Sequence, residues 1–532
     1  MASVAAQAEP SAGDMRMIIT ASSLGTVFEW YDFFIYGTLA ASGIIGRTFF
    51  PAGSEIIQTL LAWAGFAVGF GFRPLGAVLF GFLGDRLGRK YTFLVTITLM
   101  GLATAGVGLV PSAATIGLWA PGIILMLRIL QGLALGGEYG GAAIYVAEHA
   151  PPRRAGFFTS FIQASVAGGF ILSLAVVLLA KLALPDATWQ AWGWRLPFLF
   201  SLALLAVSLW MRLKLSESPV FKAMKQAGET ARNPFVESFT YPGNLVRLFV
   251  ALFGIAAGLT VIWYTAMFSV LAFLQGTMRV EETTAQLIVG AGALGGLGWF
   301  VLFGWLSDRV GRKQPIVIGY ALTLIALFPI FWVMGQAANP GLAEAAKRAP
   351  VVVSGPHCAY SPFQKQQADD CGRLLDYFSK KGVQYTTHCA PVTVVTIGDE
   401  PIADTRPEAL DAALARAGYR LAPVVPSAGG IAVILLCILL LTALSGMTYG
   451  SVAALLTELF PARIRYSSMS IPYHIGTGYF GGFLPFISQY MVARSGDPYA
   501  GLWYSWAVVA MALVVTVVFL KEPREERVAR RG

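Results

Sequence analysis

The sequence predicts an all-α membrane protein of twelve transmembrane helices, arranged as two pseudo-symmetric halves of six, with a small α/β insertion in the second half. Three observations support this fold class: the composition, a series of apolar stretches, and an internal repeat. Of 532 residues, 56% are hydrophobic and only 13% are charged, whereas soluble domains contain about 25% charged residues. We therefore expect most of the chain to lie within a bilayer.

Twelve apolar stretches are long enough for this, since a helix of about 20 apolar residues spans the hydrocarbon core. They lie at 17–46, 56–83, 91–110, 121–147, 157–184, 195–213, 246–274, 285–306, 315–335, 429–456, 469–492 and 500–520. The first stretch is longer than the apolar part of a signal peptide and follows a polar segment without a basic start, so we expect it to be retained.

Two sets of residues repeat along the chain at fixed offsets. The segment from Gly81 to Lys90 recurs from Gly304 to Lys313, 223 residues later. A second set recurs 310 residues later: Gly136, Tyr139, Gly140, Glu148, Pro151 and Arg153 match Gly446, Tyr449, Gly450, Glu458, Pro461 and Arg463. The repeat indicates a duplicated six-helix unit, and the difference of 87 between the offsets indicates an insertion in the second half.

These features give a domain plan. The expected parts are an N-terminal tail at 1–16, a first bundle at 17–214, a linker at 215–245, a second bundle at 246–335 and 429–520, the insertion at 336–428, and a C-terminal tail at 521–532. Lysine and arginine concentrate in the loops on the side of the termini, which predicts that this side is cytoplasmic and the insertion extracytoplasmic. The net charge of +9 is then a topology signal and gives no reason to expect a nucleic-acid partner.

The insertion has its own pattern of helix and strand. We expect a helix near Gln364 to Lys380, strands at Val383 to Thr387 and Val392 to Ile397, and a helix at Pro407 to Ala417, which begins with proline. The pattern predicts a small α/β domain.

Three of the four cysteines, Cys358, Cys371 and Cys389, lie in the insertion, and Cys437 lies in the tenth stretch. An oxidising compartment favours one disulfide with one thiol left over, and the spacing does not say which pair forms. A histidine precedes both Cys358 and Cys389. Neighbouring residues of a strand point to opposite faces and no C-x-x-C motif occurs, so we expect no metal site.

Ionisable residues inside the apolar stretches are the candidate functional residues, because such residues are costly and usually face a partner or a pathway. Glu29 and Asp32 share one helical face in the first stretch. The offsets match Arg73 with Gly296 and Arg128 with Ile438, so the second half lacks these cations. We expect charge in the first half and polar or aromatic walls in the second. The candidate substrate-binding residues are Arg73, Arg128, Tyr36, Gln131, Tyr139, Tyr264, Tyr449, Tyr473 and His474, although His474 also fits a hydrogen-bonded core position.

Several segments resemble the major facilitator superfamily. The repeated GxxxDRxGRK segment resembles that superfamily, and EWYDFFIYG from Glu29, RPLGAVLFGFLGDRLGRK from Arg73 and RILQGLALGGEYGGAAIYVAEHAPPRRAGFFTSF from Arg128 resemble its metabolite:proton symporter group. That group includes carriers of shikimate, 2-oxoglutarate, citrate and proline or betaine. The resemblance covers nearly the whole chain except the insertion.

The resemblance implies roles for charged residues. Asp32 with Arg128 resembles the acid and arginine that couple protons to transport in sugar porters, with Glu29 as the second candidate acid, and a purely structural ion pair is the alternative. A network of charges on the cytoplasmic side resembles the latch of the outward-open state. Its expected pairs are Asp85–Arg89, Asp308–Arg312, Glu148–Arg153 and Glu458–Arg463. Its members are Asp85, Arg86, Arg89, Asp308, Arg309, Arg312, Glu148, Arg153, Glu458 and Arg463.

The expected function is proton-coupled symport of a small metabolite by alternating access in a bacterial inner membrane, by a monomer without a cofactor or enzymatic activity. Buried arginines favour an organic acid, because guanidinium pairs bidentately with carboxylate. Uptake of a zwitterion such as betaine or proline is an alternative. A drug exporter is disfavoured because 160–174 lacks the Gly-Pro signature of such exporters, and a sensor or binding protein that works through the insertion ranks last.

Overall fold

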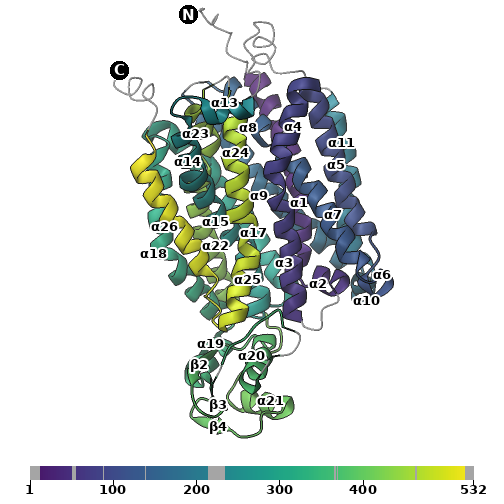
Figure 1. Ribbon diagram of the computed structural model, residues 1–532, viewed down its shortest axis with the longest axis vertical. Coiled ribbons are helices and arrows are strands. Elements are labelled where there is room, and N and C mark those ends of the chain that lie inside the picture. The colour runs from purple at the N-terminus through teal and green to yellow at the C-terminus, as the bar shows by residue number, and fades with distance from the viewer. Residues whose placement is uncertain are drawn as a thin grey trace, which may run out of the picture.

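The computed structural model describes residues 12–50, 55–87, 89–137, 139–151, 153–213, 234–356, 358–364, 367, 369–461 and 464–521. A long helical bundle carries a smaller domain at one of its ends (Figure 1). Helix α1 begins and helix α26 ends at the opposite end of the bundle. We call these two ends the insertion end and the terminal end.

The described residues of the first half form helices joined by short turns, with no strand among them. Its helices are α1 Ala12–Ala41, α2 Ile44–Phe49, α3 Glu55–Gly71, α4 Arg73–Leu87, α5 Arg89–Leu109, α6 Ala113–Ile116, α7 Trp119–Gly136, α8 Tyr139–His149, α9 Ala155–Ala183, α10 Asp186–Ala191, the 3-10 turn η1 Gly193–Arg195 and α11 Leu196–Leu213. Helix α1 therefore starts five residues before the predicted Met17.

The second half contains several π-helical turns, a feature often found at functional sites. Its elements are α13 Pro234–Thr240, α14 Asn244–Phe249, η2 Val250–Ala256, α15 Ala257–Tyr264, η3 Thr265–Ser269, α16 Val270–Ala272, η4 Phe273–Thr277, α17 Glu282–Val310, α18 Lys313–Ala338, α22 Ala428–Tyr449, α23 Val452–Leu459, α24 Arg465–Ile475, η6 Gly476–Gly482, α25 Leu484–Ser495 and α26 Leu502–Phe519. Part of the predicted linker, α13, is thus a helix, whereas 214–233 and both predicted tails apart from 12–16 and Lys521 lie outside the described residues.

Nine helical segments among the described residues are long and apolar enough to span a bilayer, and each matches a predicted stretch. The other three predicted stretches coincide with α1, α5 and the run from α24 to α25. Helix α1 carries four charged residues, Asp14, Arg16, Glu29 and Asp32. The run from α24 is interrupted by Pro472 and a π-helical segment. The count of twelve spans therefore stays a prediction.

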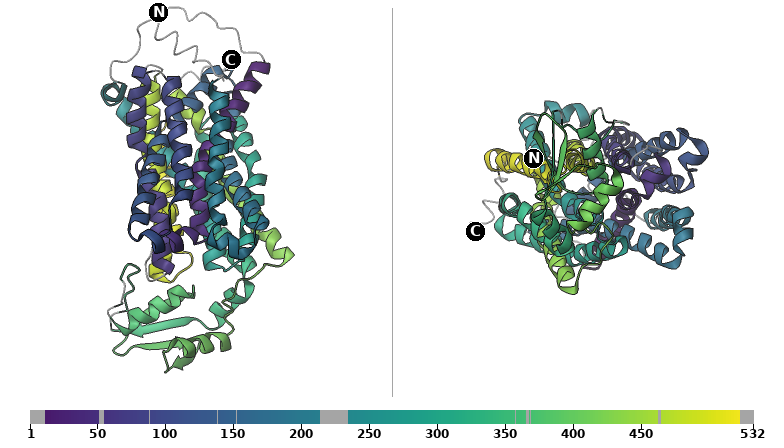
Figure 2. Two further views of the ribbon diagram at one scale, coloured as in Figure 1. Left: turned by 90° about the vertical axis from the view of Figure 1, so that its right-hand side faces the viewer. Right: turned by 90° about the horizontal axis from the view of Figure 1, so that it is seen from below.

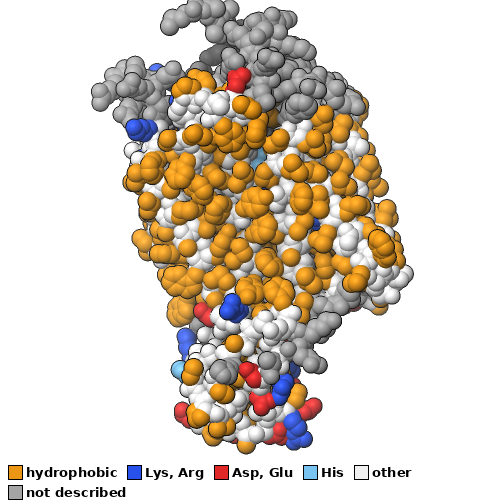
Figure 3. Space-filling model, in the orientation of Figure 1, with side chains coloured by type: hydrophobic (Ala, Val, Ile, Leu, Met, Phe, Trp, Pro, Cys, Tyr) orange, Lys and Arg blue, Asp and Glu red, His pale blue; other side chains and the backbone are white. Residues whose placement is uncertain are grey.

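The outer surface of the bundle is apolar. Hydrophobic side chains cover its flank between the two ends, while charged side chains gather on the inserted domain (Figure 3). Large side chains such as Leu118, Ile325 and Val514 are exposed there. Such a continuous apolar surface is expected where lipid, and not water, surrounds the protein.

The inserted domain has a hydrophobic core of its own, separate from that of the bundle. It contains α19 Pro340–Arg348, β1 Val351–Gly355, α20 Asp370–Lys380, β2 Tyr385–Cys389, β3 Val394–Ile397, β4 Glu400–Ile402 and α21 Pro407–Arg416. The strand order is β2-β1-β3-β4, with β1 parallel to β2 and antiparallel to β3, and β3 antiparallel to β4. We call this unit the insertion domain.

The predicted elements of the insertion domain all form, but their limits shift and three others were missed. Helix α20 starts at Asp370 and not at Gln364, because the side chain of Asp369 caps it by accepting a hydrogen bond from the backbone N–H of Gly372 at 2.6 Å. The predictions missed α19, β1 and β4. An N-cap signal for α19 was present in Asn339-Pro340, since the Asn339 side chain accepts from the N–H of Leu342.

The insertion domain is attached to the second half of the bundle. Arg279, just before α17, donates from Nη1 to the carbonyl oxygen of Leu421 at 2.9 Å, and its own carbonyl accepts from the N–H of Val424 at 2.8 Å. Phe363 stacks on Tyr490 of α25 with ring centroids 5.8 Å apart. Seen from the insertion end, the domain lies mainly beneath second-half helices (Figure 2).

Glycines on α7 allow the close approach of this helix to α3. A Cβ atom on Gly132 would overlap the carbonyl oxygen of Gly69, whereas one on Gly122, in the same helix, would meet nothing within 4 Å. Small residues that let backbones come together are the usual basis of tight helix packing in membranes.

We expect Gly132→Ala to lower the free energy of unfolding by about 1–3 kcal/mol, because the added methyl group forces α7 away from α3. Gly122→Ala is the matched control and should leave stability unchanged or raise it by up to about 1 kcal/mol through helix propensity. Thermal unfolding of the purified protein in detergent measures both. Equal unfolding midpoints for the two variants would contradict the close contact.

Candidate functional site

Two acidic side chains are buried on α1. Glu29 and Asp32 are 7% and 5% exposed. The Oδ1 atom of Asp32 is buried without a hydrogen-bond partner in the described part of the chain. Glu29 lies one helical turn before Asp32 on the same helix. A buried polar atom of this kind needs an explanation, such as water or a titrating proton.

Arg128 on α7 is fully buried and held mainly by the backbone. Its Nη1 atom donates to Oε1 of Gln131 at 2.6 Å. Nη1 also reaches the carbonyl oxygen of Phe33 at 3.5 Å, while Nε and Nη2 reach those of Gly65 and Phe66 at 3.4 Å. The guanidinium group also lies over the ring of Tyr36, 4.5 Å from its centroid.

The expected direct ion pair between Asp32 and Arg128 is absent from the described residues. The two residues are linked indirectly: Nε2 of Gln131 donates to Oγ1 of Thr104 at 2.7 Å, and Thr104 donates to the backbone oxygen of Asp32 at 3.3 Å. The Asp32 carboxylate and the Arg128 guanidinium therefore do not neutralise each other in this conformation. Gln131 connects Arg128 to Thr104, a residue that was not among the predicted site residues.

Arg73, the first residue of α4, faces the second half of the bundle. It is fully buried, and its Nη1 atom donates to Oγ1 of Thr477 in η6 at 3.3 Å. Its guanidinium lies 5.1 Å from the ring centroid of Trp30. The buried His474 lies close enough for the charge of Arg73 to act on it. Arg73 therefore lies where the two halves meet.

Aromatic side chains of α15 form the wall opposite α1. Trp263 stacks on Phe34 with centroids 5.1 Å apart, and Tyr264 packs edge-on against Phe70 at 5.5 Å. The hydroxyl groups of Tyr36 and Tyr264 are buried without a hydrogen-bond partner among the described residues. Unsatisfied buried hydroxyls near two cations are a feature of sites that hold water or a ligand.

Most of the predicted substrate-binding residues are therefore buried at or near the contact between the halves. Tyr449 and Tyr473 hydrogen-bond to each other through their hydroxyl groups at 2.7 Å. The side chain of Tyr139 lies outside the described residues. Trp30, Trp263 and Thr477 were missed. Thr477 lies one helical turn after His474, and this i to i+3 spacing was the available signal.

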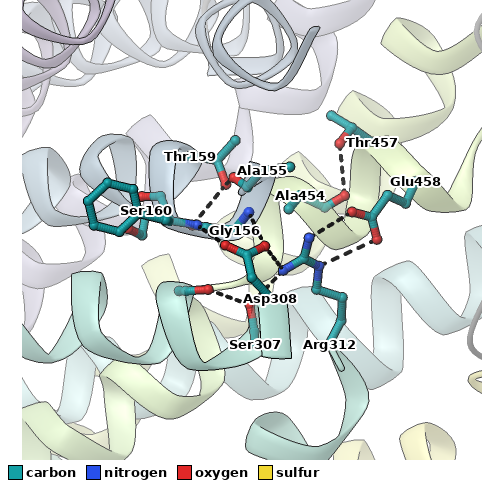
Figure 4. Close-up of polar contacts among 12 residues, drawn as sticks. Ala155, Gly156, Thr159, Ser160, Ser307, Asp308, Arg312, Ala454, Thr457 and Glu458 are labelled. Atoms are coloured by element: carbon teal, nitrogen blue, oxygen red, sulfur yellow. Dashed lines mark hydrogen bonds and ion pairs between the residues drawn. The ribbon is translucent and has the colours of Figure 1, made fainter. Parts of the chain in front are cut away.

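A polar network joins the two halves at the terminal end (Figure 4). The two carboxylate oxygens of Asp308, at the end of α17, accept from the backbone N–H groups of Gly156 and Phe157, both at 2.8 Å. These N–H groups belong to the first turn of α9, where helices favour negative charge. Arg312 donates to Asp308 at 2.7 Å and to Glu458 at 2.9 Å. We call Asp308, Arg312 and Glu458 the terminal latch.

The predicted Asp308–Arg312 pair is confirmed, and two other acids of the predicted network bind arginines that were not predicted for them. Glu148 binds Arg465 across the halves at 3.2 Å, and Arg153 is exposed. Glu458 binds Arg312, which lies nearly buried beside it. Arg309 is exposed and stacks on Trp305 at 3.9 Å, so it takes no part in the latch. Arg463 and the side chains of Asp85, Arg86 and Arg89 lie outside the described residues.

The insertion end contains a cavity of about 720 Å³ between the bundle and the insertion domain. First-half residues Arg47 and Glu55, second-half Glu282, and Lys347 and Lys380 of the insertion domain lie along it. Glu282 also binds Lys181 of α9 at 2.9 Å, across the halves. The cavity lies at the end of the bundle opposite the terminal latch.

Two helical halves that meet around buried cations, with an apolar flank, define a multi-pass membrane transporter. The chain belongs to the Major Facilitator Superfamily, since the model of that family matches residues 22–351.

Two named bacterial transporters are similar in sequence to this chain. The chain is 39% identical over 323 residues to the shikimate transporter of Escherichia coli (strain K12), which covers 59% of this chain and 72% of the relative. It is 35% identical over 325 residues to the proline/betaine transporter of the same strain, and this match covers 60% of this chain and 65% of the relative.

A solved structure of the xylose transporter XylE from E. coli, in a partially occluded inward-open conformation, has the same fold. It aligns with a TM-score of 0.60 at 16% identity, over 96% of this chain and 99% of that one. The structural likeness concerns the fold alone, and the relatives are transporters and not enzymes.

We expect Asp308→Ala to loosen the terminal end, because it removes the acceptor of two N–H groups and the partner of Arg312. A cysteine placed at the buried Ser160 of α9, in a Cys389→Ser background, reports the opening through its rate of alkylation in detergent. Loss of a charged hydrogen bond costs about 1.5–3 kcal/mol, so the rate should rise about tenfold or more. Arg309→Ala, the next residue of α17, is the control and should leave the rate unchanged; similar rates in both variants would exclude a latch at Asp308.

Proposed function

We propose that the protein is a proton-coupled symporter of a small organic acid that works by alternating access around a central site between its halves. The observation that carries this proposal is Arg73, a buried cation at the contact between the halves. It donates to Thr477, which lies one helical turn after the buried His474. A guanidinium group in an apolar interior is a natural partner for a carboxylate. The relative named a shikimate transporter supports a carboxylate substrate, since shikimate is an organic acid.

Arg73 and Arg128 have different parts in this proposal. Arg128 already has Gln131 and three carbonyl oxygens as acceptors, so it positions helices and shapes the charge of the site. Arg73 donates to Oγ1 of Thr477 in the second half, so a carboxylate bound between the halves would lie within reach of its charge. Tyr36 and Tyr264 then supply hydroxyl groups for the rest of the substrate, with Tyr449, Tyr473 and His474 in the second-half wall.

Asp32 is the proposed proton carrier, with Glu29 as the rival. Burial favours the neutral form of a carboxyl group, whereas a nearby guanidinium favours the charged form. The chain from Arg128 through Gln131 and Thr104 ends at Asp32, so a shift of α7 against α1 changes the distance between the two charges. Proton affinity at Asp32 then differs between the conformations that face the two sides.

The proposed topology follows from the distribution of basic residues. The terminal end is cytoplasmic and the insertion domain extracytoplasmic, with the membrane being a bacterial inner membrane. The terminal latch then serves as a cytoplasmic gate, and the cavity beneath the insertion domain is the outer entrance. A monomer suffices for this mechanism, since both halves belong to one chain.

Uptake of a zwitterion is the second candidate, because aromatic faces surround the site. Trp30, Trp263 and Phe34 are buried together near Arg73, and such faces attract quaternary ammonium groups. The relative named a proline/betaine transporter supports this reading. Drug export and a sensory role of the insertion domain rank below both, because no observation favours either.

We expect Arg73→Gln to raise the KM for uptake of an organic acid such as shikimate about tenfold or more, because it removes a charge-assisted hydrogen bond worth about 1.5–3 kcal/mol. Uptake by proteoliposomes at varied substrate concentration measures this. Arg416→Gln, on the exposed surface of the insertion domain, is the control and should not change KM. An unchanged KM in Arg73→Gln for every acid that the parent protein carries would refute the anion site.

We expect Asp32→Asn to retain substrate counterflow in proteoliposomes but to lose accumulation driven by a pH gradient, because the amide cannot carry the proton while the path remains open. Glu29→Gln tests the rival carboxyl group under the same conditions. Accumulation by Asp32→Asn under a proton gradient alone would show that Asp32 is not the coupling residue.

A further inference from the structure

Three cysteines of the insertion domain meet around one glycine. Cys389, the last residue of β2, is the parallel register partner of Gly355, the last residue of β1. Cys358 follows three residues after Gly355, and it forms a disulfide with Cys371 in the first turn of α20. Cys389 is a free and exposed cysteine.

The side chain of Cys389 shares a sheet face with the disulfide. In β1, Val351, Val353 and Gly355 are the buried positions, and the face they define is the one against which Cys371 lies. Register partners in neighbouring strands point to the same face. The partner of Gly355 is Cys389, so its thiol projects towards the same side as the disulfide.

The disulfide lies close to the backbone of Gly355. A Cβ atom on Gly355 would lie 2.9 Å from Sγ of Cys358 and 3.3 Å from Cβ of Cys371. The disulfide therefore occupies the space that a side chain at this position would need. The neighbouring strand lies about 4.8 Å away, and on it Cys389 is the next residue on this face.

We infer that Cys389 is the attacking thiol of an internal thiol–disulfide exchange that moves the bridge from Cys358–Cys371 to Cys358–Cys389. The Cys389 thiol gives its proton to water, and its sulfur attacks Sγ of Cys358. The Cys358–Cys389 bond forms, the Cys358–Cys371 bond breaks, and the sulfur of Cys371 leaves as a thiolate that takes up a proton. One disulfide and one thiol are present before and after, so no oxidant or reductant is consumed.

Burial selects Cys358 as the sulfur that is attacked. Cys371 is 1% exposed and sits in a helical turn that Asp369 caps. Cys358 is only partly buried and lies in a segment without regular secondary structure. Cys358 can therefore reach either partner, whereas Cys371 and Cys389 are fixed by α20 and β2.

The exchange connects to the bundle through the segment that the first disulfide closes. Phe363 lies between Cys358 and Cys371 and stacks on Tyr490 of α25 at 5.8 Å. Moving the bridge to Cys389 releases this segment from α20 and ties it to β2. The choice of disulfide partner in the insertion domain thus affects the segment that contacts α25 of the second half.

The test uses full-length protein with Cys437→Ser, so that the insertion domain holds every remaining cysteine. The protein is incubated at mildly alkaline pH, where thiols ionise (pKa about 8.5), then quenched with acid, alkylated and digested without reduction. Mass spectrometry then identifies the linked and the alkylated peptides. We expect a Cys358–Cys389 link and alkylated Cys371 to appear together, and both to be lost in Cys389→Ser. Finding only the Cys358–Cys371 link and alkylated Cys389 after incubation would overturn the inference.

Two further variants separate position from the mere presence of a thiol. Cys389→Ser with Thr386→Cys moves the thiol to the opposite face of the same strand, and it should give no alkylated Cys371. Cys371→Ser should form the Cys358–Cys389 link directly under mild oxidation. Failure of that link in protein that elutes as the parent does would show that Cys358 cannot reach β2.

Discussion

The burial of two guanidinium groups in an apolar bundle is the constraint on which the interior depends. A cation in this setting needs acceptors from the protein itself. The acceptors of Arg128 include carbonyl oxygens of α1 and α3, so the guanidinium group must come close to the backbone of these helices. Gly69 leaves the space for it, since a Cβ atom there would lie 2.9 Å from Nη2 of Arg128. The small residues of α3 and α7 thus serve helix packing and charge solvation together.

Glycines also allow close helix packing where the two halves meet. At the terminal end, Gly156 and Gly304 bring α9 and α17 so close that a Cβ on either would overlap the other helix. The Asp308 carboxylate then reaches backbone N–H groups in place of a side chain. Because the donors are backbone groups at the start of a helix, only the Asp308 side chain can adjust its rotamer, and the contact is therefore sensitive to how the two helices lie.

The sequence predicted the helical stretches, the duplicated halves and the concentration of charge in the first half, because hydropathy and repeats record them locally. It did not predict that Asp308 binds the backbone of α9, since a backbone N–H has no signature in residue type. The pairing of Glu148 with Arg465 depends on how two distant helices dock, and the pairs were expected within repeats. Strand β1 was missed because its role, pairing with both β2 and β3, is decided by residues over 30 positions away.

The attachment of the insertion domain has a mechanical consequence. The chain enters it from α18 and leaves it into α22, and Arg279 and Tyr490 hold it to the same half. In the proposed alternating-access cycle, a domain carried mainly by the second half moves with it, so a small rotation of that half displaces the far end of the domain by a larger distance. A molecule bound to that far end would then oppose the rotation and slow the proposed cycle without contacting the central site.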